Sequence, residues 1–218
     1  MPDAPLSETA ALEAITLTPL QQDLVSILRN IGGPLFALLD ASRDPLTILG
    51  MLRSSGEEYQ SLYEGMQGKM LEAFAPYLVR LPADSRLLER LIAKGWGQHW
   101  GIFVVSDVDF RALRKHFRTF LMVKGPEGKQ LYFRYYDPRV LRVYLPTCNA
   151  AEIDFVFGPV AAYLCEAETG DSLLVFQPGQ ETAQCEVVKL SGNIEEAVGA
   201  EAPPVSPGTA FLRAELSD

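Results

Sequence analysis

Apolar positions along the chain follow two alternating patterns, which predict strands and helices in turn. A continuous apolar run at residues 35–39 and two mainly apolar segments at 76–81 and 100–106 are short enough to be buried strands. Each run is followed by a capping residue, such as Asp44, and then by apolar positions at helical spacing. Strands that alternate with helices predict α/β organisation around a largely buried sheet.

The segment before the first run predicts a helix of its own. Thr18 and Gln21 have the spacing of a capping box, and Pro19 occupies the first helical position, where a missing N–H costs nothing. Apolar residues then recur at helical spacing until Gly32-Gly33, which end the pattern. We therefore expect residues 1–33 to form an N-terminal helical extension.

The second half of the chain begins with a hairpin pattern. Two apolar runs flank residues 125–128, whose sequence is Gly-Pro-Glu-Gly, a good antiparallel turn signal. Helical patterns are expected after Asp137-Pro138 and over residues 150–164, and two short strands are expected at 172–177 and 185–190. Because an antiparallel hairpin joins strand-helix units, we expect the sheet to be mixed.

The predicted fold class is therefore α/β with α+β character: a mixed β-sheet flanked by helices, with a helical C-terminal part and short extra strands. Residues 34–176 form the main domain in this interpretation. Residues 177–218 form an acidic C-terminal extension that we expect to be partly flexible, because residues 199–209 are rich in Pro, Gly, Ala and Ser.

Charge and cysteine content exclude several classes of protein. The formal net charge is −9, and residues 171–218 alone carry eight acidic and two basic side chains. An acidic chain without a basic stripe is repelled by nucleic acid and by anionic membranes, so neither is expected as a partner. Three cysteines in no metal-type spacing predict reduced, mostly buried thiols. The first 18 residues contain three acidic residues and no Lys or Arg, and no apolar run is long enough to span a bilayer. We therefore expect a cytoplasmic protein.

Sequence motifs of enzymes are mostly missing. There is no P-loop, GxGxxG, GxSxG or HExxH pattern, and two histidines are too few for a histidine-rich metal site. His116 lies among Arg and Lys residues and is expected to be solvated. His99 lies between Trp96 and Trp100. Two interpretations stay open for it: a loop histidine packed beside two indole rings, or a binding residue. We expect no metal, no cofactor and no enzymatic activity.

Three carboxylates keep an enzymatic alternative open. Asp40, Asp44 and Asp137 follow predicted strands, where α/β folds often place their sites. Asp44 and Asp137 each precede a proline at the start of a predicted helix, however, and capping alone explains that arrangement. A small carboxylate-dependent hydrolase is therefore an alternative to a non-enzymatic role.

The stretch LYFRYYDPRVLR, residues 131–142, combines aromatic rings with charges. Strand alternation places Arg134 between Tyr132 and Tyr136 on one face. A buried arginine needs a partner, and we expect Asp40 or Asp137 to supply it. The alternative is that Arg134 binds an acidic group on another protein. Arg139, Arg142 and Tyr144 follow on the predicted helix, where the two arginines are expected to be exposed.

A second aromatic stripe has the spacing of a helix. It contains Tyr59, Leu62, Tyr63, Met66 and Met70, although the sequence SLYEG also fits a short strand. Core packing is the usual meaning of such a stripe. If its side chains are exposed, flexible methionines suit the binding of another protein.

The order of the motifs adds a family resemblance. LFALLDASRDP, APYLVRL, GWGQHWGIFVVS, RYYDPRVLRVYLPTC and FGPV together resemble the DUF4123 family, which includes the Tap or TEC adaptor proteins of type VI secretion. The resemblance covers about residues 34–176. It implies a chaperone that binds a toxic effector and helps load it onto the VgrG spike protein. An immunity-type protein that blocks a toxin is a further alternative.

The resemblance matches family signature positions, and our candidate residues, some of them outside that set, fall into two groups; the matched positions are Asp40, Arg43, Asp44, Pro45, Trp96, Trp100, Arg134, Asp137, Pro138 and Arg139. The structural positions are Asp40, Arg43, Asp44 and Asp137. The positions that the resemblance and the exposed aromatic pattern suggest for partner binding are Trp96, Trp100, Arg134, Tyr136, Arg139, Arg142 and Tyr144.

Overall fold

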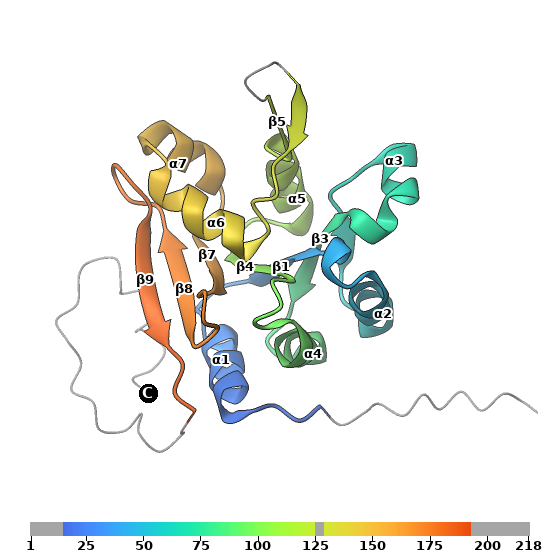
Figure 1. The fold of residues 1–218 in the computed structure, drawn as a ribbon, viewed down its shortest axis with the longest axis vertical. Coiled ribbons are helices and arrows are strands. Elements are labelled where there is room, and N and C mark those ends of the chain that lie inside the picture. The colour runs from blue at the N-terminus through green and yellow to red at the C-terminus, as the bar shows by residue number, and fades with distance from the viewer. Residues whose placement is uncertain (1–14, 125–128, 193–218) are drawn as a thin grey trace, which may run out of the picture.

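The computed structural model describes residues 15–124 and 129–192. A seven-stranded sheet forms its centre, in the order β2-β3-β1-β4-β7-β8-β9, and β5 and β6 form a separate two-stranded ribbon (Figure 1). The strands are β1 Leu35–Asp40, β2 Tyr59–Ser61, β3 Pro76–Leu81, β4 Gly101–Val105, β5 Met122–Lys124, β6 Gln130–Tyr132, β7 Ala162–Glu166, β8 Ser172–Gln177 and β9 Gln184–Lys189.

Helices cover both faces of the sheet. They are α1 Pro19–Arg29, α2 Pro45–Ser55, α3 Gly65–Met70, α4 Arg86–Gly95, α5 Phe110–Thr119, α6 Pro138–Tyr144 and α7 Ala150–Phe157, with short 3₁₀ helices η1 Ala41–Arg43, η2 Glu72–Phe74 and η3 Leu145–Thr147. Within the described residues, no helix combines the length and the apolar character that crossing a bilayer requires.

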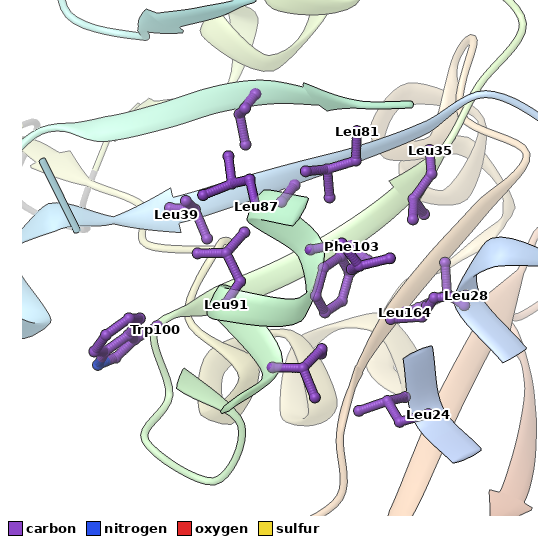
Figure 2. Packing of buried hydrophobic residues seen from close by; sticks show 14 of the residues in the cluster. Leu24, Leu28, Leu35, Leu39, Leu81, Leu87, Leu91, Trp100, Phe103 and Leu164 are labelled. Atoms are coloured by element: carbon purple, nitrogen blue, oxygen red, sulfur yellow. The ribbon is translucent and has the colours of Figure 1, made fainter. Parts of the chain in front are cut away.

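The core lies in two layers, one on each side of the sheet. On one face, side chains of α1, α2 and α4 pack against odd-numbered residues of β1, such as Leu35 and Leu39. Figure 2 shows Leu91 of α4 beside this layer. On the other face, α5, α6 and α7 pack against even-numbered residues such as Phe36. Because every residue of β1 is buried, its sequence is a continuous apolar run and not an alternating one.

The predicted class, a sheet flanked by helices, is confirmed, but the strand directions differ from the prediction. All described pairings in the main sheet are antiparallel, whereas we expected a mixed sheet. The reason is visible at β1 and β3, where Asp40 lies opposite Pro76 and Leu35 opposite Leu81. Strands β1 and β2 run in the same direction, because each pairs antiparallel with β3, but β3 lies between them, so the strand-helix-strand unit through α2 brings no two parallel strands side by side.

Helix boundaries follow the capping residues that the sequence predicts. Thr18 and Gln21 form both bonds of a capping box on α1, and Asp44 caps α2 by accepting the N–H of Thr47 at 3.1 Å. Gly56 ends α2 in the left-handed conformation at φ +77°. These ends are confirmed because each depends on residues within one turn of the helix.

Two local predictions are wrong, and the structure decides a third segment whose conformation the sequence left open. The helix predicted over residues 150–164 ends at Phe157, and residues 162–166 form β7. The strand predicted through Tyr136 ends at Tyr132, and residues 134–137 form a turn in which the N–H of Asp137 donates to the carbonyl of Arg134 at 3.0 Å. The aromatic stripe from Tyr59 to Met70 does not form one helix, since β2 ends at Ser61 and α3 begins at Gly65.

Both ends of the described chain join the central sheet. Helix α1 packs on the first core layer, and β9 pairs with β8 along its whole length. The predicted boundaries at residues 33 and 177 remain predictions. Residues 125–128, predicted to form the hairpin turn, and residues 199–209, predicted to be flexible, lie outside the described residues, although β5 and β6 do pair antiparallel as predicted. Cys148 and Cys165 are buried and Cys185 is exposed, and all three are free.

Candidate functional site

A cluster of four charged side chains connects the end of β1 to the turn that follows the ribbon. The Asp40 side chain is only 1% exposed. Its Oδ1 accepts hydrogen bonds from the backbone N–H of Ser42 at 3.0 Å and from the Ser42 hydroxyl at 2.6 Å. Its Oδ2 accepts a hydrogen bond from Arg134 Nη2, which also forms an ion pair with it. The buried carboxylate is thus fully supplied with donors.

Asp137 forms the second half of this charged cluster. It caps α6 by accepting the N–H of Arg139 at 3.0 Å, and the Arg139 side chain contacts both carboxylate oxygens, at 3.0 and 2.7 Å. Arg134 Nη2 lies 3.9 Å from Asp137 Oδ2. We expected Arg134 to pair with Asp40 or Asp137, and it lies between the two.

The chemistry of this cluster is that of a structural network. Burial alone would raise the pKa of Asp137, but the hydrogen bonds from the Arg139 side chain and backbone, together with the charges of Arg139 and Arg134, hold the pKa below its ordinary value. A general acid needs the opposite shift. Capping by Asp44 and Asp137 is confirmed, and no group of three or more metal-ligating side chains occurs among the described residues.

A second network holds the loop of residues 96–100 against the sheet. Its centre is Glu166 at the end of β7, whose side chain is 3% exposed. Glu166 accepts the backbone N–H of Gly97 at 2.5 Å and that of His99 at 3.1 Å, and its Oε1 also contacts His99 Nδ1. His99 has a left-handed backbone at φ +59°, which is rare outside glycine. The indole N–H of Trp96 donates to the carbonyl of Gly170 at 2.7 Å.

The sequence did not identify Glu166 as a functional candidate. One sequence signal could have identified it: Glu166 is an acidic residue at the end of an apolar segment. A charged side chain at the end of a buried strand needs hydrogen-bond partners, which indicates a polar network. The signal is missed because the helix predicted over residues 150–164 covers the start of β7 and leaves Glu166 outside any predicted strand. A cavity of about 20 Å³ beside Glu166, Trp96 and Trp100 has room for about one water molecule, so it does not fit an organic substrate.

Two hydrogen bonds to backbone carbonyls join the segments that carry the two networks. The N–H of Asp40 donates to the carbonyl of Trp100 at 2.7 Å, and Arg142 Nη1 donates to the backbone carbonyl of Glu166 at 2.7 Å. Arg142 is therefore half-buried and anchored, which contradicts the exposed position that we expected for it. Arg139 is 47% exposed at its side chain, in agreement with the expectation.

The remaining predicted partner-binding residues differ in accessibility. Tyr136 is 2% exposed and Trp100 is 8% exposed, so neither offers much surface to another protein. Tyr144 is half-buried and packs edge-on against Phe133, with ring centroids 4.7 Å apart. Arg43 is exposed. His116 is half-buried, with Nε2 2.9 Å from the carbonyl of Val156, so the solvated position predicted for it is wrong.

Exposed apolar side chains gather on α3 and on the β5–β6 ribbon, which project at the same end of the molecule (Figure 1). Tyr63, just before α3, contacts Tyr132 of the ribbon with ring centroids 5.3 Å apart. Met66 and Met70 are each 79% exposed, and Leu131 is 51% exposed. The apolar end surface, as we name it, consists of Met66, Met70, Met122, Val123, Leu131 and Tyr132.

The charged cluster fixes the base of the ribbon. The N–H of Phe133 donates to the carbonyl of Leu121 at 2.9 Å, which extends the pairing of β5 with β6 by one step. Arg134 comes next and is bound to Asp40. The ribbon therefore leaves the domain from a point that an ion pair and a backbone hydrogen bond hold in place.

Of three comparisons with known proteins, one gives a match. No curated protein matches the chain, and no solved structure matches it. Residues 35–154 match the model of a family described as a domain of unknown function, DUF4123, and this region contains both the charged cluster and the loop of residues 96–100. The match covers more than half of the chain, which thus belongs to the DUF4123 family, whose domain is found in the effector adaptor proteins of type VI secretion.

Proposed function

We propose that this protein is a non-enzymatic, cytoplasmic adaptor that binds a toxic type VI effector and promotes its loading onto the VgrG spike. The observation that carries the proposal is the apolar end surface, because six apolar side chains are exposed on two projecting elements. Exposed apolar side chains that gather at one end of a folded domain often mark a site of protein binding, and here they lie on both faces of the ribbon, Met122 with Tyr132 on one face and Val123 with Leu131 on the other. Family membership supplies the class of partner.

The residues of this surface suit an adaptable interface. Methionine side chains are flexible and polarizable, so Met66 and Met70 can fit apolar groups of varied shape. They lie four positions apart on α3 and therefore face the same side of the helix. The ribbon adds the ring of Tyr132, which contacts Tyr63 just before α3 and combines a large apolar area with a polar tip.

The charged cluster has a supporting role in this proposal. Arg134, Asp40 and Asp137 bind one another beneath the ribbon, so they set its direction and do not themselves need to contact the effector. This role agrees with the burial of the two carboxylates and with the lowered pKa of Asp137. It explains why the charges in this stretch lack the arrangement of an acid-base pair.

Co-purification tests the proposal. The protein would be co-expressed with the candidate effector from its gene neighbourhood and with VgrG, and the retained effector would be quantified. Met70→Glu and Leu131→Glu each place a charge on the apolar end surface, and each should weaken effector binding by about tenfold or more.

A matched control carries the same charge elsewhere. Ala83 is exposed in the loop after β3, at the Leu81 end of the strand, whereas the charged cluster lies at the opposite end, beside Pro76. Ala83→Glu should leave binding unchanged. Equal retention of the effector by all three variants would contradict the proposed surface, and failure of the unmodified protein to retain any effector would contradict the adaptor role itself.

A further inference from the structure

The outer edge of β9 is the longest unpaired strand edge in the described part of the main sheet. The sheet ends at β2 on one side and at β9 on the other, and Figure 1 shows β9 on the side of the molecule away from α3. Strand β2 has three residues, whereas β9 has six, and its pairing with β8 continues without a bulge. Long, regular edges are where a further strand can add.

The register identifies the β9 residues whose backbone groups point outward. Leu190 lies opposite Asp171, one step beyond the Lys189–Ser172 pair, and its N–H donates to the carbonyl of Asp171 at 3.1 Å. Hydrogen-bonded pairs alternate along an antiparallel ladder. Residues 188, 186 and 184 therefore bond to β8, and residues 189, 187 and 185 present their N–H and C=O groups to the outside.

A second hydrogen bond supports this assignment independently. The carbonyl of Ser172 accepts the N–H of Ala167 at 2.9 Å, in the hairpin between β7 and β8. The backbone of Ser172 thus faces β7, and Lys189 opposite it has no partner for its backbone groups in β8.

Side chains at this edge favour one kind of occupant. Glu186 is exposed, and no side-chain partner for it occurs among the described residues. Lys189, a residue type that often protects edges, has its ammonium group 3.0 Å from Asp171 Oδ2. On the opposite face of the strand, Val187 is 55% exposed and lies across from Leu174. The charge without a side-chain partner along this edge, that of Glu186, is therefore negative, and Val187 adds exposed apolar surface beside it.

We propose that β9 accepts an extended segment of a partner protein as an added antiparallel strand, with a basic residue opposite Glu186 and apolar residues opposite Val187 and Cys185. Backbone hydrogen bonds to residues 185, 187 and 189 supply the affinity, and the side chains set the register. A second copy of this chain is a poorer occupant. A pair centred on Val187 would bring two Glu186 side chains into diagonal contact, in a protein of net charge −9.

The inference goes beyond the proposed function and does not depend on it. An adaptor that brings two proteins together needs two separate surfaces, and β9 and the apolar end surface lie on different sides of the molecule (Figure 1). The edge can nevertheless be tested on the isolated protein, without an effector or a spike protein.

Amide hydrogen exchange followed by NMR is the first test. In the free full-length protein, the amides of residues 185, 187 and 189 should exchange rapidly, while those of 184, 186 and 188 should be protected. Protection of the outward amides in a protein that is monomeric by light scattering would show that the edge is already covered, and would overturn the proposal. Protection in a dimer that dissociates in Val187→Pro would identify a second copy as the occupant and would also overturn it.

The second test adds a probe, the capped peptide Thr-Val-Val-Lys-Val-Thr, which places its lysine opposite Glu186. Binding should slow the exchange of the three outward amides. Val187→Pro removes an outward N–H without breaking the β8 ladder, and it should weaken binding by about tenfold. Val187→Thr keeps that N–H and is the matched control, with an affinity within about twofold of the unmodified protein.

Charge reversal keeps the proposal testable if the proline variant fails to fold. Glu186→Lys should weaken binding of the lysine peptide by about threefold to tenfold and should restore binding of a peptide with glutamate at that position. Equal affinity of the unmodified protein, Val187→Pro and Glu186→Lys for the lysine peptide would overturn the proposed strand addition.

Discussion

Removal of the Arg134 guanidinium is the most informative change in the charged cluster. In Arg134→Met, the Asp40 carboxylate, 1% exposed at its side chain, would keep its two bonds from Ser42 but lose its cationic partner. Loss of one partner from a fully buried ion pair costs about 3–5 kcal/mol, and exposed pairs contribute about 0–1 kcal/mol. Because the Arg134 side chain is 42% exposed, we expect an intermediate loss, about 2 kcal/mol.

Urea unfolding followed by circular dichroism measures this loss, and thermal unfolding should show a fall in Tm of about 4–8 °C for a chain of this length. Asp40→Asn removes the opposite charge, so the double variant should be less destabilised than the sum of the single variants by about 1–2 kcal/mol. Arg111→Met, at an exposed position on α5, controls for the loss of a positive charge and should change stability by less than about 0.5 kcal/mol. Additive single-variant effects, or a loss as small as that of the control, would refute the buried ion pair.

Three further predictions concern the sheet, the loop network and pH. A Cβ at Gly101 would lie 2.0 Å from the carbonyl oxygen of Leu38, so Gly101→Ala should lower the free energy of unfolding by about 3 kcal/mol. A Cβ at Gly50 on α2 would meet no atom within 4 Å outside its own helix, so Gly50→Ala should raise that free energy by about 0.5–1 kcal/mol. Urea unfolding measures both changes. Glu166→Gln should destabilise the protein by about 1–2 kcal/mol and shift its tryptophan fluorescence, and an unchanged spectrum would contradict the anchoring of the loop. Burial lowers the pKa of His116, so below about pH 6.5 the unfolded chain binds more protons than the folded chain, and the free energy of unfolding should fall. Urea unfolding at pH 7.5 and at pH 5.5 measures this fall. His116→Gln should reduce it, and an equal fall in the variant would contradict the assignment.

Features that depend on neighbouring residues were predictable from the sequence. Caps at Thr18, Asp44 and Asp137 fall where expected, because a cap bonds to N–H groups within three positions of itself. The continuous apolar run of β1 also indicated its burial on both faces. Pairing of Arg134 with Asp40 and Asp137 was predictable because few carboxylates follow strands in this chain.

Features that depend on distant contacts were not predictable. Strand β7 looked like the end of a helix, because Ala162 and its neighbours form an apolar run without a clear period and only pairing with β4 and β8 settles its conformation. Glu166 binds backbone groups almost seventy positions earlier in the chain. Burial of Tyr136 and Trp100 and exposure of Met66 likewise follow from tertiary packing, which periodicity alone does not determine.

The central claim is that the protein delivers an effector, and a secretion assay tests it most directly. The gene would be deleted from the producing bacterium, and the effector would be measured in the culture medium and in the cells. Our account predicts that the effector disappears from the medium, that the producer survives, and that the unmodified gene restores secretion whereas Leu131→Glu does not. Continued secretion of the effector would contradict the adaptor role, and death of the producer would identify an immunity protein instead.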